Sequence, residues 1–266
     1  MGAGQSAADQ VLAATLGGLP RAEHGYLIAL GTARRIPFAR VADGEWLVAQ
    51  IGLQTQRWPS VDQHVLATLW WYSVSQVFLT PTLASLFVTG QPLSPRLADV
   101  DLHWLPGGRI LTAGSNAVLA GMAVRDDGAV RDDGDPVKAV ALALRESLEI
   151  AVAAIARAGA KREPPLWAIA TDSLANRLLW LGKARGEVDR ATSLAARLIE
   201  LIGPPMPAPR YVDVDRRAPR TGQARFVRRG SCCLIYLEPG EAKCASCPRL
   251  APATRIELLR TAADFG

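Results

Sequence analysis

The chain has 266 residues, a formal net charge of +5 at pH 7, 49% hydrophobic residues and 21% charged residues. These proportions are typical of a globular protein and exclude a disordered chain, and the charge is too small to indicate nucleic acid by itself. All four cysteines lie between Cys232 and Cys247, and this clustering is the first feature that needs a chemical explanation.

The amino-terminal segment bears on the redox state of these cysteines. Met1–Gly18 has no basic stretch followed by an apolar run and a small-residue cleavage site, so we predict no secretory signal. A protein that stays in the reducing cytoplasm rarely carries structural disulfides. Four clustered cysteines there are more often a metal site than a disulfide framework.

The first third of the chain predicts helices and one ambiguous segment. Val11–Leu19 has the pattern of an amphipathic helix, and Ile36–Ala49 is compatible with a strand or a loop. The apolar run Val65–Val88 is long enough to cross a bilayer, but scattered Ser, Thr and Gln residues dilute it. We therefore predict buried helices of a core.

Within this run, Thr80-Pro81 is typical of an N-cap followed by the first residue of a new helix. We predict two consecutive helices, over residues 61–79 and 81–88. Ser60 and Gln63 have the spacing of a capping box that would open the first of them.

The next segment predicts a small β-structure. Val100–Leu105 and Arg109–Ala113 flank a Gly-rich turn, as in a hairpin, and Val118–Val124 is a candidate third strand. The acidic stretch Arg125–Asp135 lacks the ligand spacing of a calcium loop. We expect it to be a solvated loop.

Four helices are predicted in the remainder of the chain. Asp135 caps and Pro136 opens one that ends near Ala158. The others are predicted over residues 164–182, 187–201 and 252–264, with proline-rich residues 203–209 as a linker. The expected fold class is α+β and predominantly helical. Residues 1–205 form a helical body with a small β-hairpin or sheet, and residues 206–266 hold the linker, an arginine-rich stretch and a C-terminal cysteine-rich segment.

The cysteine pattern is Cys232-Cys233, ten residues, then Cys244-Ala-Ser-Cys247. A Cys-x-x-Cys pair suits one metal ion, so we expect Cys244 and Cys247 to share one. Adjacent cysteines in an extended chain point apart, which is awkward for a single tetrahedral ion and suits two metal centres. Thiolate ligation is compatible with zinc and with iron–sulfur, and the adjacent pair favours iron–sulfur.

The segment Arg228-Arg229-Gly230-Ser231-Cys232-Cys233-Leu234-Ile235-Tyr236, with Pro239-Gly240 ahead of Cys244-Ala-Ser-Cys247, resembles the FhuF family of ferric siderophore reductases. The resemblance covers residues 228–249, and the helical region around residues 171–176 is similar in character to the body of that family. It implies a cytoplasmic, often membrane-associated oxidoreductase. In that family four cysteines, here Cys232, Cys233, Cys244 and Cys247, hold a 2Fe–2S cluster that reduces a ferric siderophore, most often a hydroxamate, and releases iron(II).

Six arginines and no acid lie in Arg216–Arg229. They could offset the negative charge of such a cluster, form a docking face for an acidic electron donor, or belong to a solvated basic linker. RNA binding is less favoured, because only Tyr211 and Phe226 are interleaved there. No Gly-x-Gly-x-x-Gly motif indicates a nucleotide domain, so we expect electrons from a ferredoxin or a reductase.

The expected reaction requires no general acid, base or nucleophile, and we name no catalytic residue. His24, His64 and His103 are interpreted as structural. We expect the chelate to bind in a groove between the helical body and the cysteine segment. A zinc-stabilised binding module and an iron–sulfur redox sensor without turnover are the alternative functions.

Overall fold

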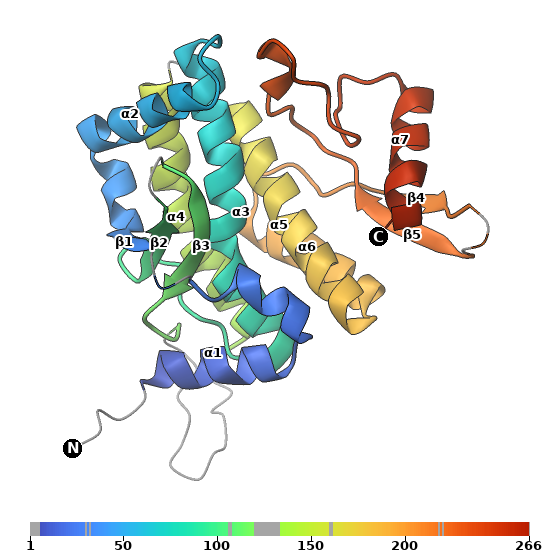
Figure 1. The fold of residues 1–266 in the computed structure, drawn as a ribbon. Coiled ribbons are helices and arrows are strands. Elements are labelled where there is room, and N and C mark those ends of the chain that lie inside the picture. The colour runs from blue at the N-terminus through green and yellow to red at the C-terminus, as the bar shows by residue number, and fades with distance from the viewer. Residues whose placement is uncertain are drawn as a thin grey trace.

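The computed structural model describes residues 6–29, 31, 33–105, 108–119, 134–159, 162–217, 219 and 221–265. Its centre is the long helix α3, Gln63–Thr89, which packs against α5, Glu163–Arg185 (Figure 1). The helices α4, Pro136–Ala158, and α6, Val188–Ile202, complete the bundle. The predicted class is confirmed: a predominantly helical α+β fold with a small sheet and a cysteine-containing C-terminal segment.

The prediction of a break at Pro81 is wrong, because α3 continues through that residue. Proline removes one backbone donor inside a helix. The hydroxyls on either side of it bond to other carbonyls of the same helix: Thr80 Oγ1 donates to the Gln76 carbonyl at 2.7 Å, and Ser85 Oγ donates to the Pro81 carbonyl at 2.8 Å. The surrounding segment is buried, so packing on several sides outweighs the local signal. No helix among the described residues is long and apolar enough to cross a membrane.

The start of α3 also differs from the prediction. The N-cap position is Asp62 and its side chain makes no capping hydrogen bond, so the Ser60–Gln63 capping box is not formed. The backbone N–H of Ser60 instead donates to Glu238 Oε2 at 3.1 Å. A contact with a distant part of the chain has replaced the local one.

The small sheet is antiparallel, in the order β1, Arg34–Pro37, β2, Val100–Trp104, and β3, Ile110–Ser115. The predicted hairpin is confirmed as β2 and β3. The third strand of this sheet is β1. Most of the candidate strand Val118–Val124, namely residues 120–124, lies outside the described residues, and Val118 forms an isolated bridge with Leu93. The acidic segment is likewise undescribed except for its last two residues.

Short helices fill the amino-terminal part. They are α1, Ala7–Gly17; η1, Arg21–Tyr26; η2, Phe38–Ala42; α2, Gly44–Gly52; and η3, Leu53–Gln56. The segment 36–49, expected to be strand or loop, is therefore strand only at its start. Asp43 caps α2 by accepting from the Trp46 backbone N–H at 3.0 Å, a local signal that the prediction missed.

Helix α4 begins and ends as predicted, with Asp135 as its N-cap. Helix α5 passes the expected stop at Gly182 and ends at Arg185. A Cβ at Gly182 would lie 2.6 Å from Ala191 Cβ, so this glycine permits the close approach of α6 rather than ending a helix. Helix α6 lies within one residue of its predicted bounds.

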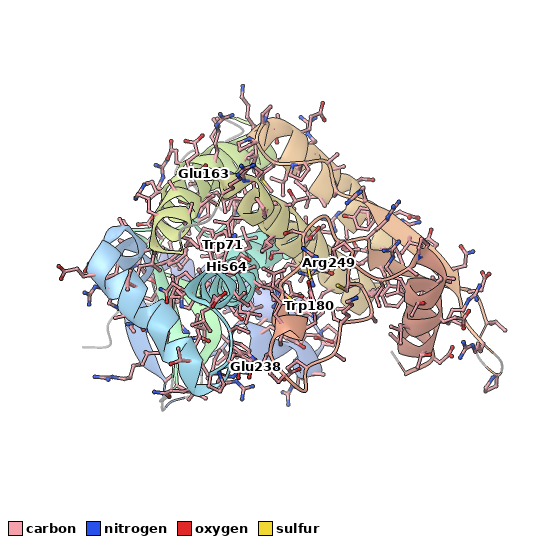
Figure 2. All side chains as sticks on the ribbon, turned by 90° about the horizontal axis from the view of Figure 1, so that it is seen from above. His64, Trp71, Glu163, Trp180, Glu238 and Arg249 are labelled. Carbon is pink, nitrogen blue, oxygen red and sulfur yellow. The ribbon has the colours of Figure 1, made fainter. Side chains whose placement is uncertain are left out.

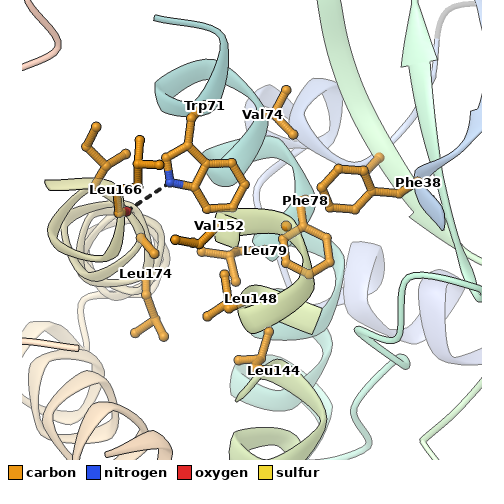
Figure 3. Close-up of a cluster of buried hydrophobic side chains, with 14 of the residues drawn as sticks. Phe38, Trp71, Val74, Phe78, Leu79, Leu144, Leu148, Val152, Leu166 and Leu174 are labelled. Carbon is orange, nitrogen blue, oxygen red and sulfur yellow. Dashed lines mark hydrogen bonds between the residues drawn. The ribbon is translucent and has the colours of Figure 1, made fainter. Parts of the chain in front are cut away.

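The main core lies between these helices. Trp71, Phe78 and Leu148 are among its fully buried side chains, and the indole N–H of Trp71 donates to the Leu166 carbonyl at 2.9 Å (Figure 3). Cys233 belongs to the same hydrophobic cluster. The cysteine segment is thus packed on the helical body.

Beyond α6 the chain forms a hairpin that the sequence analysis missed, β4, Tyr211–Asp215, and β5, Gln223–Val227. The short helix η4, Ile235–Leu237, follows, and α7, Pro252–Phe265, confirms the predicted last helix. Together β4, β5 and α7 bury a small core of their own around Val214 and Leu259. The hairpin, the cysteine segment and α7 lie on one side of the bundle (Figure 1).

Candidate metal centre

The four cysteines lie in the segment between β5 and α7. Cys232 and Cys233 follow β5, and Cys244 and Cys247 lie beyond η4. The chain reverses between them with the help of two positive φ angles, +67° at Leu234 and +87° at Gly240. Gly240 is part of the predicted Pro239-Gly240 turn, whereas Leu234 is a branched residue in a conformation that usually belongs to glycine.

The thiols are arranged as two pairs. Cys232 Sγ lies 3.6 Å from Cys247 Sγ. Cys233 Sγ and Cys244 Sγ both face the guanidinium of Arg229, whose Nη1 lies 4.0 Å and 3.4 Å from them, respectively. In the protein alone, Cys247 thus has Cys232 as its near sulfur neighbour, and the sharing of one metal ion by Cys244 and Cys247 stays a prediction.

The pairing also affects the thiol pKa values of the protein alone. A hydrogen bond with Cys233 lowers the pKa of Cys232, and the backbone N–H of Leu234, which lies 3.4 Å from Cys232 Sγ, contributes in the same direction. The hydrogen bond with Cys233 and then burial raise the pKa of Cys244. The thiols are thus coupled to one another before any metal binds.

Arg229 is the cation of the site. Only 2% of the residue is exposed, and its guanidinium lies over the ring of Tyr72, 4.4 Å from the ring centroid. Within the part of the chain that the structure describes, its Nε and Nη2 atoms have no hydrogen-bond partner, although Nε lies 3.8 Å from Asp172 Oδ2 as part of an ion pair. A buried arginine that has such donors and contacts two of the thiols is matched to a further negative acceptor.

Asp172 anchors the cysteine segment to the helical body. It lies on α5 and is 3% exposed. Its carboxylate accepts from the backbone N–H of Gly230, at 2.9 Å and 3.0 Å to the two oxygens, and from the backbone N–H of Ser231 at 3.2 Å. Burial raises the pKa of Asp172, and these two N–H groups oppose the rise. The two residues before Cys232 are thereby fixed to the body.

The arrangement fits a two-metal cluster. Metal–sulfur bonds of about 2.3 Å in a tetrahedral site place two thiolates about 3.8 Å apart, close to the separation of Cys232 and Cys247. The unused Arg229 donors could supply hydrogen bonds to the sulfur atoms of a charged cluster held by these cysteines. Among the described residues, no three His, Cys, Asp or Glu side chains converge as ligands of one ion.

Of the six arginines in the predicted basic stretch, only Arg229 contacts the cysteines among the described residues. Arg225 pairs with Asp213 and Asp189, and Arg217 pairs with Glu257 and Asp264 on α7. The remaining members are Arg216, which donates to the Ala263 carbonyl, Arg228, which is exposed, and Arg220, which lies outside the described residues. Most of the stretch is therefore the β4–β5 hairpin, held to its neighbours by ion pairs.

The histidines have separate locations. His24 Nε2 lies 2.9 Å from the Leu16 carbonyl at the end of α1, and His103 Nδ1 lies 2.8 Å from Thr112 Oγ1 in the sheet. His64, near the start of α3, lines a cavity beside Cys232.

Asp172 and Tyr72, which contact the cysteine segment, were not recognised from the sequence. The sequence offered one signal for Asp172, namely an aspartate among the apolar residues of a predicted helix, which indicates a buried polar contact.

Comparison with known families supports this reading of the segment. Residues 229–249 match the FhuF 2Fe-2S C-terminal domain. No curated protein matches the chain. The match begins at Arg229, the buried cation, and includes all four cysteines. It supports a 2Fe–2S cluster as the cofactor and identifies residues 229–249 as a FhuF-type iron–sulfur segment.

Proposed function

We propose that the protein is a ferric-siderophore reductase, which reduces an iron(III)–siderophore chelate by one electron and releases iron(II) in the cytoplasm. The observation that carries the proposal is the arrangement of the thiols as two pairs, one of which faces a buried arginine, within the segment that matches the FhuF domain. Cys232, Cys233, Cys244 and Cys247 are the proposed ligands. When bound, a 2Fe–2S cluster supplies the one-electron chemistry.

The residues around the thiols favour the reduced state. The buried positive charge of Arg229 and the Leu234 N–H beside Cys232 Sγ both stabilise added negative charge, which raises the reduction potential of an iron–sulfur centre. Cys233 and Cys247 are 5% and 1% exposed, so water is largely excluded around half of the ligand set. The chain thereby tunes the electron transfer without acid–base chemistry.

Reduction loosens the chelate because hydroxamate oxygens are hard donors. Such ligands hold iron(III) far more tightly than iron(II). One electron is therefore sufficient for iron release, and no catalytic acid or base is invoked. We propose a hydroxamate siderophore as the substrate class and a separate ferredoxin or reductase as the electron source.

The division of labour follows the proposed domains. Residues 1–205 present the substrate, and residues 206–266 carry the cluster ligands and their support. Arg229 and Asp172 connect the two parts, so the cluster is held against the surface that binds the chelate. We propose a cytoplasmic protein that associates peripherally with the inner face of the membrane.

The test is iron release by anaerobically purified protein. With a supplied reductant and a ferric trihydroxamate, we expect repeated turnover, measured as iron(II) trapped by a chromogenic chelator, and visible absorption from the cluster. The Cys233→Ser and Cys244→Ser variants should lose or strongly alter the absorption, whereas the control Ser246→Ala keeps all four thiols and should retain it.

Two outcomes contradict the proposal. A colourless protein with one stoichiometric zinc, even after reconstitution with iron and sulfide, would show a binding module. A cluster that is reduced and reoxidised without sustained iron(II) release would show a sensor.

A further inference from the structure

A cavity of about 670 Å³ opens beside Cys232. One wall comes from the helical body, with His64 of α3 and Pro165 of α5, and the other from the cysteine segment, with Tyr236, Leu237 and Arg249. Its volume lies within the range of small-molecule binding sites. We refer to this cavity as the Cys232 groove.

The two walls are connected at one end of the groove. The Ser60 N–H just before α3 donates to Glu238 just after η4, and Asp172 holds Gly230, another lining residue, from below. His64, Glu238 and Arg249 are seen from above in Figure 2, at the junction of the body and the C-terminal segment. The groove is therefore part of the packed structure rather than a gap between loose parts.

Of the four thiols, only Cys232 lines the groove. Its partner Cys247 lies 3.6 Å away and is buried, and Cys233 faces the helical core. A molecule in the groove would thus lie next to Cys232 and close to its neighbour Cys247. Such a molecule would therefore lie close enough to Cys232 to accept an electron from a cluster that this cysteine helps to hold.

The charges of the groove select the kind of acceptor. Its walls combine apolar side chains, such as Pro165 and Leu237, with polar ones, and the described lining residues include no Asp or Glu. Arg249 and Lys243 both lie near the Tyr236 ring, 5.8 Å and 5.4 Å, respectively, from its centroid. The rim therefore offers donors to oxygen ligands, and the apolar side chains of the walls suit an uncharged molecule.

The cluster charge points in the same direction. Four thiolates, two sulfides and two iron(III) ions sum to −2, and one added electron gives −3. A ferric tricatecholate carries −3 and would be repelled at close range, whereas a ferric trihydroxamate with no further charged group is neutral. The two positive charges of Arg229 and Arg249 leave a net −1 beside the reduced cluster, so repulsion of an anionic chelate remains.

We propose that the Cys232 groove binds an uncharged ferric trihydroxamate, with Arg249 donating to the hydroxamate oxygens and the chelate lying against Cys232. This inference rests on the proposed function. It goes beyond that function by assigning the binding site and the charge of the substrate.

The test measures binding of a chelate that cannot be reduced. Holoprotein is titrated by calorimetry with the gallium(III) complex of desferrioxamine E, an uncharged cyclic trihydroxamate, and with the gallium(III) complex of enterobactin, a tricatecholate of charge −3. We expect saturable binding of the first complex and at least tenfold weaker binding of the second.

Two substitutions at exposed positions of the groove complete the design. Arg249→Ala removes the donor, and Leu237→Asp adds a carboxylate to a side chain that is 46% exposed. Each should weaken binding of the trihydroxamate complex at least tenfold while the cluster absorption is retained. Arg157→Ala is the control, because this exposed arginine lines a different cavity between α2 and α4.

Wild-type binding affinity in both groove variants, absence of binding to the unsubstituted protein, or tighter binding of the tricatecholate would each overturn the proposal. These outcomes are separable from the reductase activity. If the protein releases iron(II) but does not bind the gallium complex in the groove, the proposed binding site is wrong and the proposed reductase activity stands. If the gallium complex binds in the groove but no iron(II) is released, the proposed binding site stands and the proposed reductase activity is wrong.

Discussion

At the scale of single residues, Arg229 is the side chain that most directly links the helical body to the thiols. Its guanidinium contacts two sulfur atoms, one aromatic ring and one carboxylate. A planar guanidinium can serve these different neighbours at once, which a lysine ammonium cannot. Its role is to position and to stabilise charge, not to react.

Replacing Arg229 should change the reduction potential. Arg229→Gln removes a charged donor from Cys244 Sγ, and losing one hydrogen bond of about 1.4 kcal/mol to the reduced state lowers a one-electron potential by about 60 mV. Arg229→Lys keeps the positive charge but loses the planar set of guanidinium donors, so it should lower the reduction potential by less. Potentiometric titration followed by electron paramagnetic resonance measures both.

The matched control is Arg225→Gln, whose guanidinium pairs with Asp213 and Asp189 and contacts no cysteine. Its potential should equal that of the unsubstituted protein. An unchanged potential in Arg229→Gln, with an intact cluster signal, would show that the arginine does not tune the centre.

Asp172 has a mechanical role at the same scale. Asp172→Asn leaves one oxygen for two backbone N–H donors and presents an amide NH₂ to the other. We expect a loss of about 1–3 kcal/mol in unfolding free energy, the cost of a buried unsatisfied donor, and faster cluster loss. Urea unfolding and the decay of visible absorption test this, with the exposed Asp189→Asn as control. Equal stability of both variants would contradict the anchoring role.

At the scale of elements, the contact between α5 and α6 depends on a glycine. A Cβ at Gly182 would approach Ala191 Cβ to 2.6 Å and the Glu187 carbonyl oxygen to 3.1 Å. Gly182→Ala should therefore destabilise the fold by about 1–3 kcal/mol through overpacking, measured by urea unfolding.

Gly17→Ala is the natural comparison for that substitution. Gly17 is the last residue of α1 and has nothing within 4 Å of an added Cβ. Alanine there should be neutral or stabilise by up to about 1 kcal/mol. The interpretation of Gly182 fails if the two variants have the same stability.

The same elements show which signals in the sequence could be used. Asp135-Pro136 marks the start of α4 because both the cap and the proline act within one turn. Gly182 and Pro81 were misleading because distant helices decide their environment. The β4–β5 hairpin was missed because paired charges such as Arg225 with Asp213 resemble a solvated basic stretch until the partner strand is known.

At the scale of the whole molecule, the protein has a large helical core and a small C-terminal one. Only a few residues of the cysteine segment, including Cys233, join the large core. Most of the helical core is therefore independent of any metal, whereas the loop between β5 and α7 contains little regular structure apart from η4. We therefore expect the stability of this loop to depend on the metal centre that its cysteines bind.

Removal of the cluster should then open the loop and leave the body folded. We expect trypsin to cleave at Lys243 and Arg249, both exposed, at least tenfold faster in the apoprotein than in the holoprotein. Cleavage after Arg157 at the end of α4 should be unchanged. Mass spectrometry of the fragments distinguishes this result from uniform acceleration at all sites, which would mean that the metal supports the entire fold.

The site as a whole was only partly accessible from the sequence. The four cysteines could be found because their spacing carries the chemistry within 16 residues. Asp172, Tyr72 and His64 could not, since helix packing alone brings α3 and α5 to these cysteines. The proximity of Cys232 and Cys247 also depends on the reversal of chain direction near Leu234. No local sequence pattern predicts that reversal, because leucine rarely adopts a positive φ.

The Asp172 anchor has a consequence for biosynthesis. Asp172 precedes the cysteines it fixes by about sixty positions, and the wall residues His64 and Pro165 precede them as well. Because translation proceeds from the amino terminus and earlier regions fold first, the ribosome delivers the anchor before the first thiol emerges. We therefore expect iron and sulfide to enter a loop that already has a folded surface to pack on, so that assembly of the centre follows folding of the helical body.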